Sequence, residues 1–126
     1  MRWFLLMLLL AGCASATLTP EPSASPSQVS IRALLTAPAT YDRQPVLVQG
    51  QIEHVLRGQT MEGGRRVTIF TLVGADGQRI RAVMWGFPSL LEGSPVELRG
   101  IFRAGFRIDE RDFQGIIEIR EIRPLL

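Results

Sequence analysis

Apolar and polar residues alternate along five separate stretches of this 126-residue chain. The stretches cover residues 46–53, 66–73, 78–85, 96–103 and, less regularly, 115–123. An alternation with a period of two places the apolar side chains on one face of an extended strand, as with Val46, Val48 and Ile52 in the first stretch. Five such strands in succession predict an all-β domain.

The segments between the strands contain recognisable turn residues. Residues 74–77, Gly-Ala-Asp-Gly, predict a tight hairpin because glycine and aspartate tolerate positive φ. Residues 59–64 predict a longer hairpin loop. Residues 88–92 predict one helical turn between the third and fourth strands, which Gly93 would end.

A short helix is expected before the first strand. Apolar residues between 29 and 40 fall near helical spacing, with Ser30 placed to cap the helix and Pro38 to stop the pattern. The helix and the five strands together make one domain over residues 29–126.

Two of the strand segments resemble each other. Residues 45–52 and 95–102 each begin with proline, continue with alternating apolar residues and carry glycine at the sixth place, Gly50 and Gly100. A glycine within a strand indicates a bulge or a sharp bend where the strand passes from one half of a small barrel to the other. Equivalent structural roles explain the similarity better than duplication, which needs more than two short copies.

The order of these elements resembles an OB fold. More narrowly, residues 34–46 look like the start of bacterial envelope OB-domain proteins of the tRNA-anticodon-binding type. The resemblance implies a five-stranded Greek-key barrel with one short helix before strand one and another between strands three and four. It also implies that strands one and four are neighbours.

The N-terminus resembles a bacterial lipoprotein signal. Arg2 precedes an apolar run that ends in the tetrapeptide Leu10-Ala11-Gly12-Cys13, which is the lipobox pattern. The resemblance implies cleavage before Cys13 and lipid attachment to its sulfur, so residues 1–12 would be a signal peptide. The apolar run is too short to span a bilayer.

Residues 13–28 are rich in Ala, Ser, Thr and Pro and show no apolar periodicity, so we interpret them as a disordered tether behind the lipid. Ala14 and Ser15 follow the cysteine, and neither is the aspartate that lipoprotein sorting associates with the inner membrane. We therefore expect attachment to the cell envelope facing the periplasm, in a two-membrane bacterium at the inner leaflet of the outer membrane.

The composition argues against catalysis. All 14 basic residues are arginine, which excludes lysine-dependent mechanisms, and the chain has one histidine, His54, and one cysteine. No serine lies in a Gly-x-Ser-x-Gly motif, and the carboxylates of residues 109–112 match no calcium loop. We expect no enzyme activity, no metal and no cofactor.

The resemblance implies a ligand surface on the face of strands two and three, between the first hairpin loop and the loop joining strands four and five. The candidate contact residues there are Arg57, Arg65, Arg66, Arg79, Arg81, Trp85, Arg103, Phe106 and Arg107. Acidic residues in the same loops, Glu62 and Asp109 among them, would cancel much of their charge, so many of these arginines are expected to be a solvated outer face.

Two binding hypotheses follow. The first is a membrane-anchored module that binds a protein or an envelope polymer. The second is a binder of single-stranded nucleic acid or oligosaccharide, in which arginine meets phosphate and an aromatic ring meets the base. The mature chain is nearly neutral, so its overall charge gives nucleic acid little support.

Overall fold

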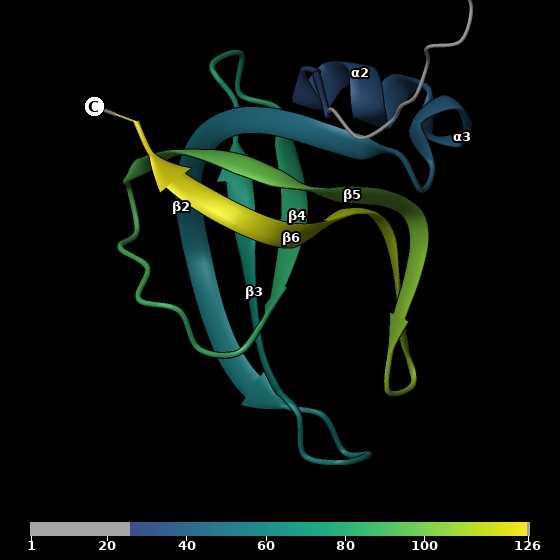
Figure 1. Ribbon diagram of the computed structural model, residues 1–126, viewed down its shortest axis with the longest axis vertical. Helices are drawn as coiled ribbons and strands as arrows, with labels where there is room; N and C mark the ends of the chain where they lie inside the picture. The colour runs from purple at the N-terminus through teal and green to yellow at the C-terminus, as the bar shows by residue number, and fades with distance from the viewer. Residues whose placement is uncertain (1–25, 126) are drawn as a thin grey trace, which may run out of the picture.

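The computed structural model describes residues 26–125, and this part of the chain is mostly β (Figure 1). In chain order the elements are β1 (Ser27–Gln28), α2 (Ile31–Thr36), α3 (Pro38–Tyr41), β2 (Pro45–Gln59), β3 (Arg66–Val73), β4 (Arg79–Trp85), β5 (Pro95–Ile108) and β6 (Arg111–Pro124). The signal peptide, Cys13 and most of the expected tether lie outside the described residues.

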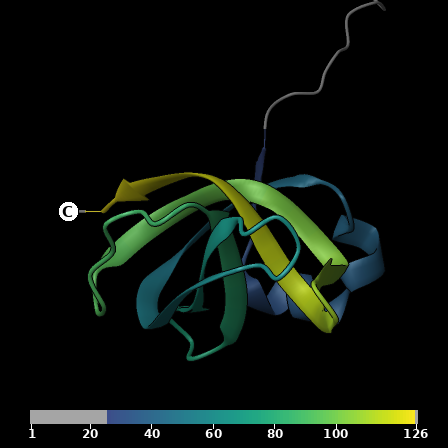
Figure 2. The ribbon, with the colours of Figure 1, turned by 90° about the horizontal axis from the view of Figure 1, so that it is seen from below.

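The strands form one sheet in the order β1-β2-β3-β4-β6-β5, and β2 also pairs with β5. Starting from β2, the pairing therefore passes through β3, β4, β6 and β5 and returns to β2. Figures 1 and 2 show the resulting curvature, with α2 and α3 beside the sheet at one end. Five of the six strands are those that the alternation predicts; the sixth, β1, is a two-residue strand that pairs parallel with β2 and includes the last residues of the expected tether.

Several local predictions are confirmed. The hydroxyl oxygen of Ser30 accepts a hydrogen bond from the Ala33 amide and caps α2. The hairpin at residues 74–77 is closed by the Gly74 amide, which donates to the Gln78 carbonyl over 2.8 Å.

Pro38 does not end the helical region, since it begins the second short helix, α3. Neither α2 nor α3 is long and apolar enough to cross a membrane.

The helical turn expected at residues 88–92 is absent, and the segment between β4 and β5 is irregular. Its polar groups bond to β2: the Pro88 carbonyl accepts from Arg57, and the Glu92 carboxylate accepts from the Val55 amide. So short a segment gains few helical hydrogen bonds. Those bonds to β2, with Leu90 packed against the core, hold the segment in place instead.

The last two strands are longer than the sequence indicated. β5 and β6 continue past the sheet as a hairpin that pairs Ile108 with Arg111 across the two-residue turn Asp109–Glu110. Asp109 has a φ of 55°, which two-residue hairpin turns often require and aspartate tolerates. We refer to residues 104–115 as the β5–β6 hairpin.

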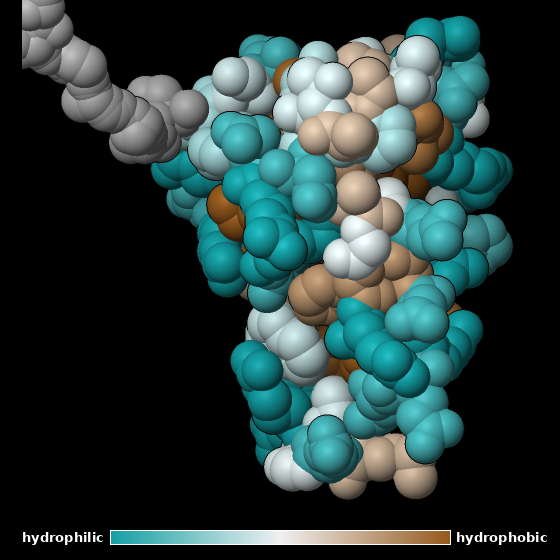
Figure 3. Space-filling model, turned by 90° about the vertical axis from the view of Figure 1, so that its right-hand side faces the viewer, coloured by the Kyte–Doolittle hydropathy of each residue, from teal (hydrophilic) through white to brown (hydrophobic). Residues whose placement is uncertain are grey.

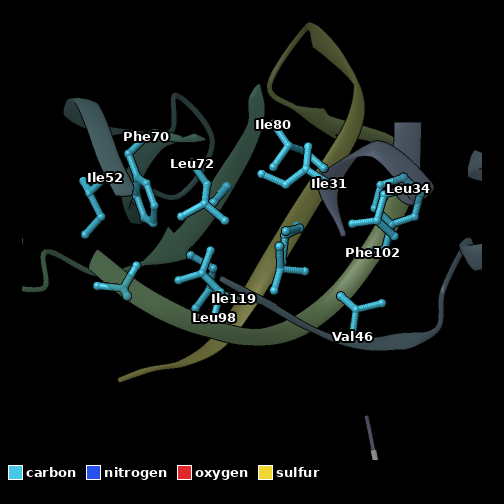
Figure 4. Close-up of a cluster of buried hydrophobic side chains, with 14 residues drawn as sticks. Ile31, Leu34, Val46, Ile52, Phe70, Leu72, Ile80, Leu98, Phe102 and Ile119 are labelled. Carbon is cyan, nitrogen blue, oxygen red and sulfur yellow. The ribbon is translucent and has the colours of Figure 1, made fainter. Parts of the chain in front are cut away.

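The core fills the inside of the curved sheet, and Figure 4 shows its side chains pointing toward one another. Val46, Val48 and Ile52, which the alternation placed on one face of the first strand, are each at most 1% exposed. Ile31 and Leu34 of α2 pack into the same cluster. The helix therefore covers one end of the core.

The two similar segments are neighbours, as the resemblance implies. In the antiparallel register of β2 and β5, Val46 lies opposite Gly100. Gly50 lies opposite Val96, so the two segments are related by an approximate two-fold axis. Both glycines sit at close approaches: a Cβ on Gly50 would lie 2.7 Å from the Leu72 side chain.

Candidate functional site

The β5–β6 hairpin folds over the outer face of β3 and β4. A second apolar cluster lies between them, separate from the core, in which Ile108 and Phe113 of the hairpin join Val67 and Val83 of the sheet. Val83 is fully buried and Val67 is 6% exposed. The face on which a ligand was expected is therefore partly covered by the protein's own chain, around Val67 and Val83.

An open groove lies between the β5–β6 hairpin and residues 56–59 at the end of β2. It has a volume of about 190 Å³. The side of β2 contributes Leu56, which is 67% exposed and lies opposite Ile69 of β3. The hairpin supplies Ile108 and Phe113 from the other side. The groove therefore has apolar walls and, through Arg111 and Asp109, a charged rim.

A hydrogen-bond pair fixes the hairpin to the β2–β3 loop beside the groove. The Met61 amide donates to both carboxylate oxygens of Asp109, each 3.0 Å away. The carboxylate is thereby engaged by main chain and faces no arginine within 4.0 Å among residues 26–125. Figure 3, viewed from the hairpin side, shows apolar side chains down the middle of this face between hydrophilic ones.

Replacing Asp109 should loosen this connection. In Asp109→Gly the positive φ is kept and the acceptor is lost, so we expect about 1 kcal/mol less stability and faster exchange of the Met61 amide, measured by NMR. Asp109→Asn, which tolerates the same φ and retains an acceptor oxygen, should stay close to the unmodified protein. Equal exchange in both variants would show that the carboxylate does not hold the loop.

Three of the candidate arginines are in ion pairs. The pairs are Arg79 with Glu53 at 3.1 Å, Arg103 with Glu118 at 2.9 Å and Arg107 with Asp112 at 3.7 Å. The Arg79 and Arg107 pairs are exposed and contribute little to stability, whereas the Glu118 carboxylate is nearly buried. Their charge is nevertheless balanced locally, as the solvated-face interpretation expects, and they are weak candidates for ligand contact.

The arginines at the β2–β3 end are arranged differently. Arg65 lies over the Trp85 ring with its guanidinium carbon 3.7 Å from the ring centroid, and Arg66 lies 5.5 Å from that of Phe87. Arg57 lines the groove, and its guanidinium group donates to the Pro88 carbonyl. Within the described part of the chain, none of the three has a carboxylate within 4.0 Å.

Phe113 brings together two further arginines. The guanidinium carbons of Arg81 and Arg111 lie 5.6 Å and 5.4 Å from its ring centroid, and across residues 26–125 neither has a carboxylate within 4.0 Å. Arg81 was a candidate from the sequence, whereas Arg111 and Phe113 were not. Residues 111–113 read Arg-Asp-Phe, so no alternation singled them out, and their position depends on the fold of the hairpin.

The Glu118 carboxylate of β6 links the Trp85 side chain of β4 to the Arg103 side chain of β5. Glu118 is 8% exposed, and one of its oxygens accepts two hydrogen bonds from Arg103 while the other accepts one from the Trp85 indole. The Trp85 ring is thus held at its edge and covered on one face by Arg65. Phe106 likewise has Arg103 beside its ring, at 6.0 Å. These rings offer little free surface for stacking a base.

The titratable side chains of residues 26–125 do not gather into a metal site. Residues 26–125 hold no group of three or more His, Cys, Asp or Glu side chains placed to bind a metal. His54 is exposed at a bulge of β2, 3.9 Å from Glu53. At the far end of the sheet the Gln78 amide, helped by Arg32, lowers the pKa of the Asp76 carboxyl. That carboxyl closes a turn.

No protein-family model matches this chain, and no curated protein matches its sequence. The resemblances to a lipoprotein signal and to an OB fold therefore rest on the residues and on the strand pairing alone.

Proposed function

We propose that this protein is a non-enzymatic lipoprotein of the bacterial cell envelope, held to the membrane by lipid on Cys13. Its domain is an OB-fold-like Greek-key barrel that faces the periplasm. Support for the anchor comes from the lipobox residues. Support for the barrel comes from the circuit of strand pairing and from the neighbouring glycine-containing segments of β2 and β5.

The proposed activity is binding of a partner in the groove between β2 and the β5–β6 hairpin. The observation that carries it is the exposed apolar side chain of Leu56 in the groove. It lies beside arginines that form no ion pair with a carboxylate among the described residues. Apolar surface with a polar rim is typical of sites that bind other proteins or polymers. Such a module would hold its partner near the membrane at the length of the tether.

The anchor is tested by Cys13→Ser. We expect the variant to remain an unprocessed precursor that incorporates no labelled palmitate in growing cells, whereas the unmodified protein is processed and labelled. Ser15→Ala is the matched control, which should behave as the unmodified protein. Processing of Cys13→Ser at the same position would contradict lipidation.

Binding is tested by photo-crosslinking in cells. A photoreactive amino acid at Gln59, which lines the groove, should give a covalent product of discrete mass. The same residue at Ala75, in the turn at the opposite end of β3, should not give that product. Equal products at both positions, or none at Gln59, would count against the groove as the binding site.

Single-stranded nucleic acid or oligosaccharide remains the second candidate, favoured only by the arginines near Trp85 and Phe113 that lack carboxylates. A gel shift with oligonucleotides and a glycan array test it directly. Binding that disappears in Arg81→Ala would support this candidate, and blank results would remove it.

A further inference from the structure

We propose that the partner segment is an extended acidic peptide that places one large apolar side chain against Leu56 and Ile69 and its carboxylates beside Arg81 and Arg111. The inference rests on the proposed function, in that it takes the groove between β2 and the β5–β6 hairpin as the site. It adds the chemistry of the occupant, which the position of the groove does not indicate by itself.

The size of the groove points to a side chain. Its volume of about 190 Å³ is below the 300–1,000 Å³ typical of pockets for drug-sized ligands. The walls are aliphatic and aromatic, from Leu56 and Ile69 on the sheet and Ile108 and Phe113 on the hairpin. Burying the exposed Leu56 side chain against a partner's apolar residue removes apolar surface from water, which favours binding.

The edge of β2 suits an extended main chain. Residues 56–59 pair with β3 on one side, and no other strand among residues 26–125 pairs with them. Residues 88–92 bond to the Val55 amide and the Arg57 side chain, so the edge open to a peptide that adds as a strand is that of Gly58 and Gln59. In this mode the main chain gives affinity and the side chains give specificity.

The charges beside the groove favour an acidic partner. Arg65, Arg81 and Arg111 have no carboxylate within 4.0 Å across the described residues, and aromatic rings hold their guanidinium groups in place. Two acidic side chains lie at the loop tips, Glu62 and Glu110. The Asp109 carboxylate is bonded to the Met61 amide, so the arginines outnumber the acids that oppose them.

The same rings argue against a nucleic acid in this place. Trp85 is covered by Arg65 and bonded through its indole to Glu118. Phe113 is 6% exposed and lies between two arginines. A base would need to displace these contacts before stacking, whereas a carboxylate pairs with a guanidinium that remains on its ring.

The test is selection from a random peptide library displayed on phage, against the processed protein purified from membranes in detergent. We expect the enriched peptides to carry Asp or Glu on both sides of a large apolar residue. A fluorescein-labelled copy of an enriched peptide should then bind at least tenfold more weakly to Leu56→Asp and to the double variant Arg81→Gln/Arg111→Gln. Arg123→Gln is the matched control, because Arg123 lies near the C-terminal end of β6 and does not line the groove.

Enrichment of basic peptides, or binding unchanged in both groove variants, would overturn the inference. Far-ultraviolet circular dichroism of each variant shows whether the fold is kept, and Leu56→Ser serves if Leu56→Asp unfolds. A crosslinked partner at Gln59 that proves to be a glycan or a basic protein would leave the proposed binding function standing and exclude the acidic peptide. Absence of any groove-specific crosslink would instead argue against the binding function itself.

Discussion

Gly100→Ala should destabilise the domain more than any other single-methyl change in the sheet, by about 3 kcal/mol. A Cβ on Gly100 would overlap the Glu118 carbonyl oxygen and lie 3.0 Å from both the Glu118 carbonyl carbon and Ile119 Cα. All three atoms are main chain, so β5 and β6 must separate to make room. Chemical denaturation followed by circular dichroism should show a lower midpoint with little change in slope.

Gly58→Ala is the matched control for this prediction. Gly58 also lies within a strand, on β2, but a Cβ there meets no atom within 4 Å. The substitution should be neutral or slightly stabilising, because alanine restricts the unfolded chain. If Gly58→Ala and Gly100→Ala lost equal stability, the close approach of β5 and β6 would not be the reason for glycine at position 100.

Much of the fold was predictable because the alternation of buried and exposed residues is a local property. In β3 the buried Phe70 and Leu72 alternate with partly exposed residues, and the predicted bounds agree with the observed Arg66–Val73. The glycines at 50 and 100 also carried long-range information, since each marks a place where another strand passes too close for a side chain. The neighbouring of β2 and β5 itself was what the OB-fold resemblance implied, and the strand pairing shows it.

The prediction failed where tertiary contacts decide the conformation. Residues 88–92 have helix-compatible ends, but hydrogen bonds from Arg57 and Val55 of β2 hold them in an irregular path. β1 exists only because β2 offers two residues an open edge. Neither contact leaves a local trace in the sequence.

The candidate site was predictable only in part. The sequence singled out arginine and aromatic residues, and Arg65 does lie over the Trp85 ring, while Arg81 lies beside the ring of Phe113. It did not indicate that the β5–β6 hairpin would cover this face, because Gly105 and charged residues interrupt the alternation there. Charge pairing across strands, as between Arg103 and Glu118, depends on a register that only the folded sheet defines.

Glu118→Ala should cost about 2 to 3 kcal/mol, the second-largest loss that we expect. The carboxylate is nearly buried and accepts from Arg103 and from the Trp85 indole. Its removal leaves both donors unpaired in a partly buried position, which costs more than the bonds themselves contribute. Urea denaturation followed by circular dichroism measures the loss.

The same variant should alter the environment of Trp85. In a full chain carrying Trp3→Phe, Trp85 is the only tryptophan, so its emission reports this site alone. We expect the Glu118→Ala emission maximum to shift to longer wavelength as the ring gains freedom and meets water. Glu121 lies on β6, the strand of Glu118, and is an exposed partner of Arg99. Glu121→Ala should leave the emission unchanged and cost less than about 0.5 kcal/mol. Equal losses in the two variants would mean that Glu118 is no more than a surface ion-pair partner and that Trp85 is held by packing.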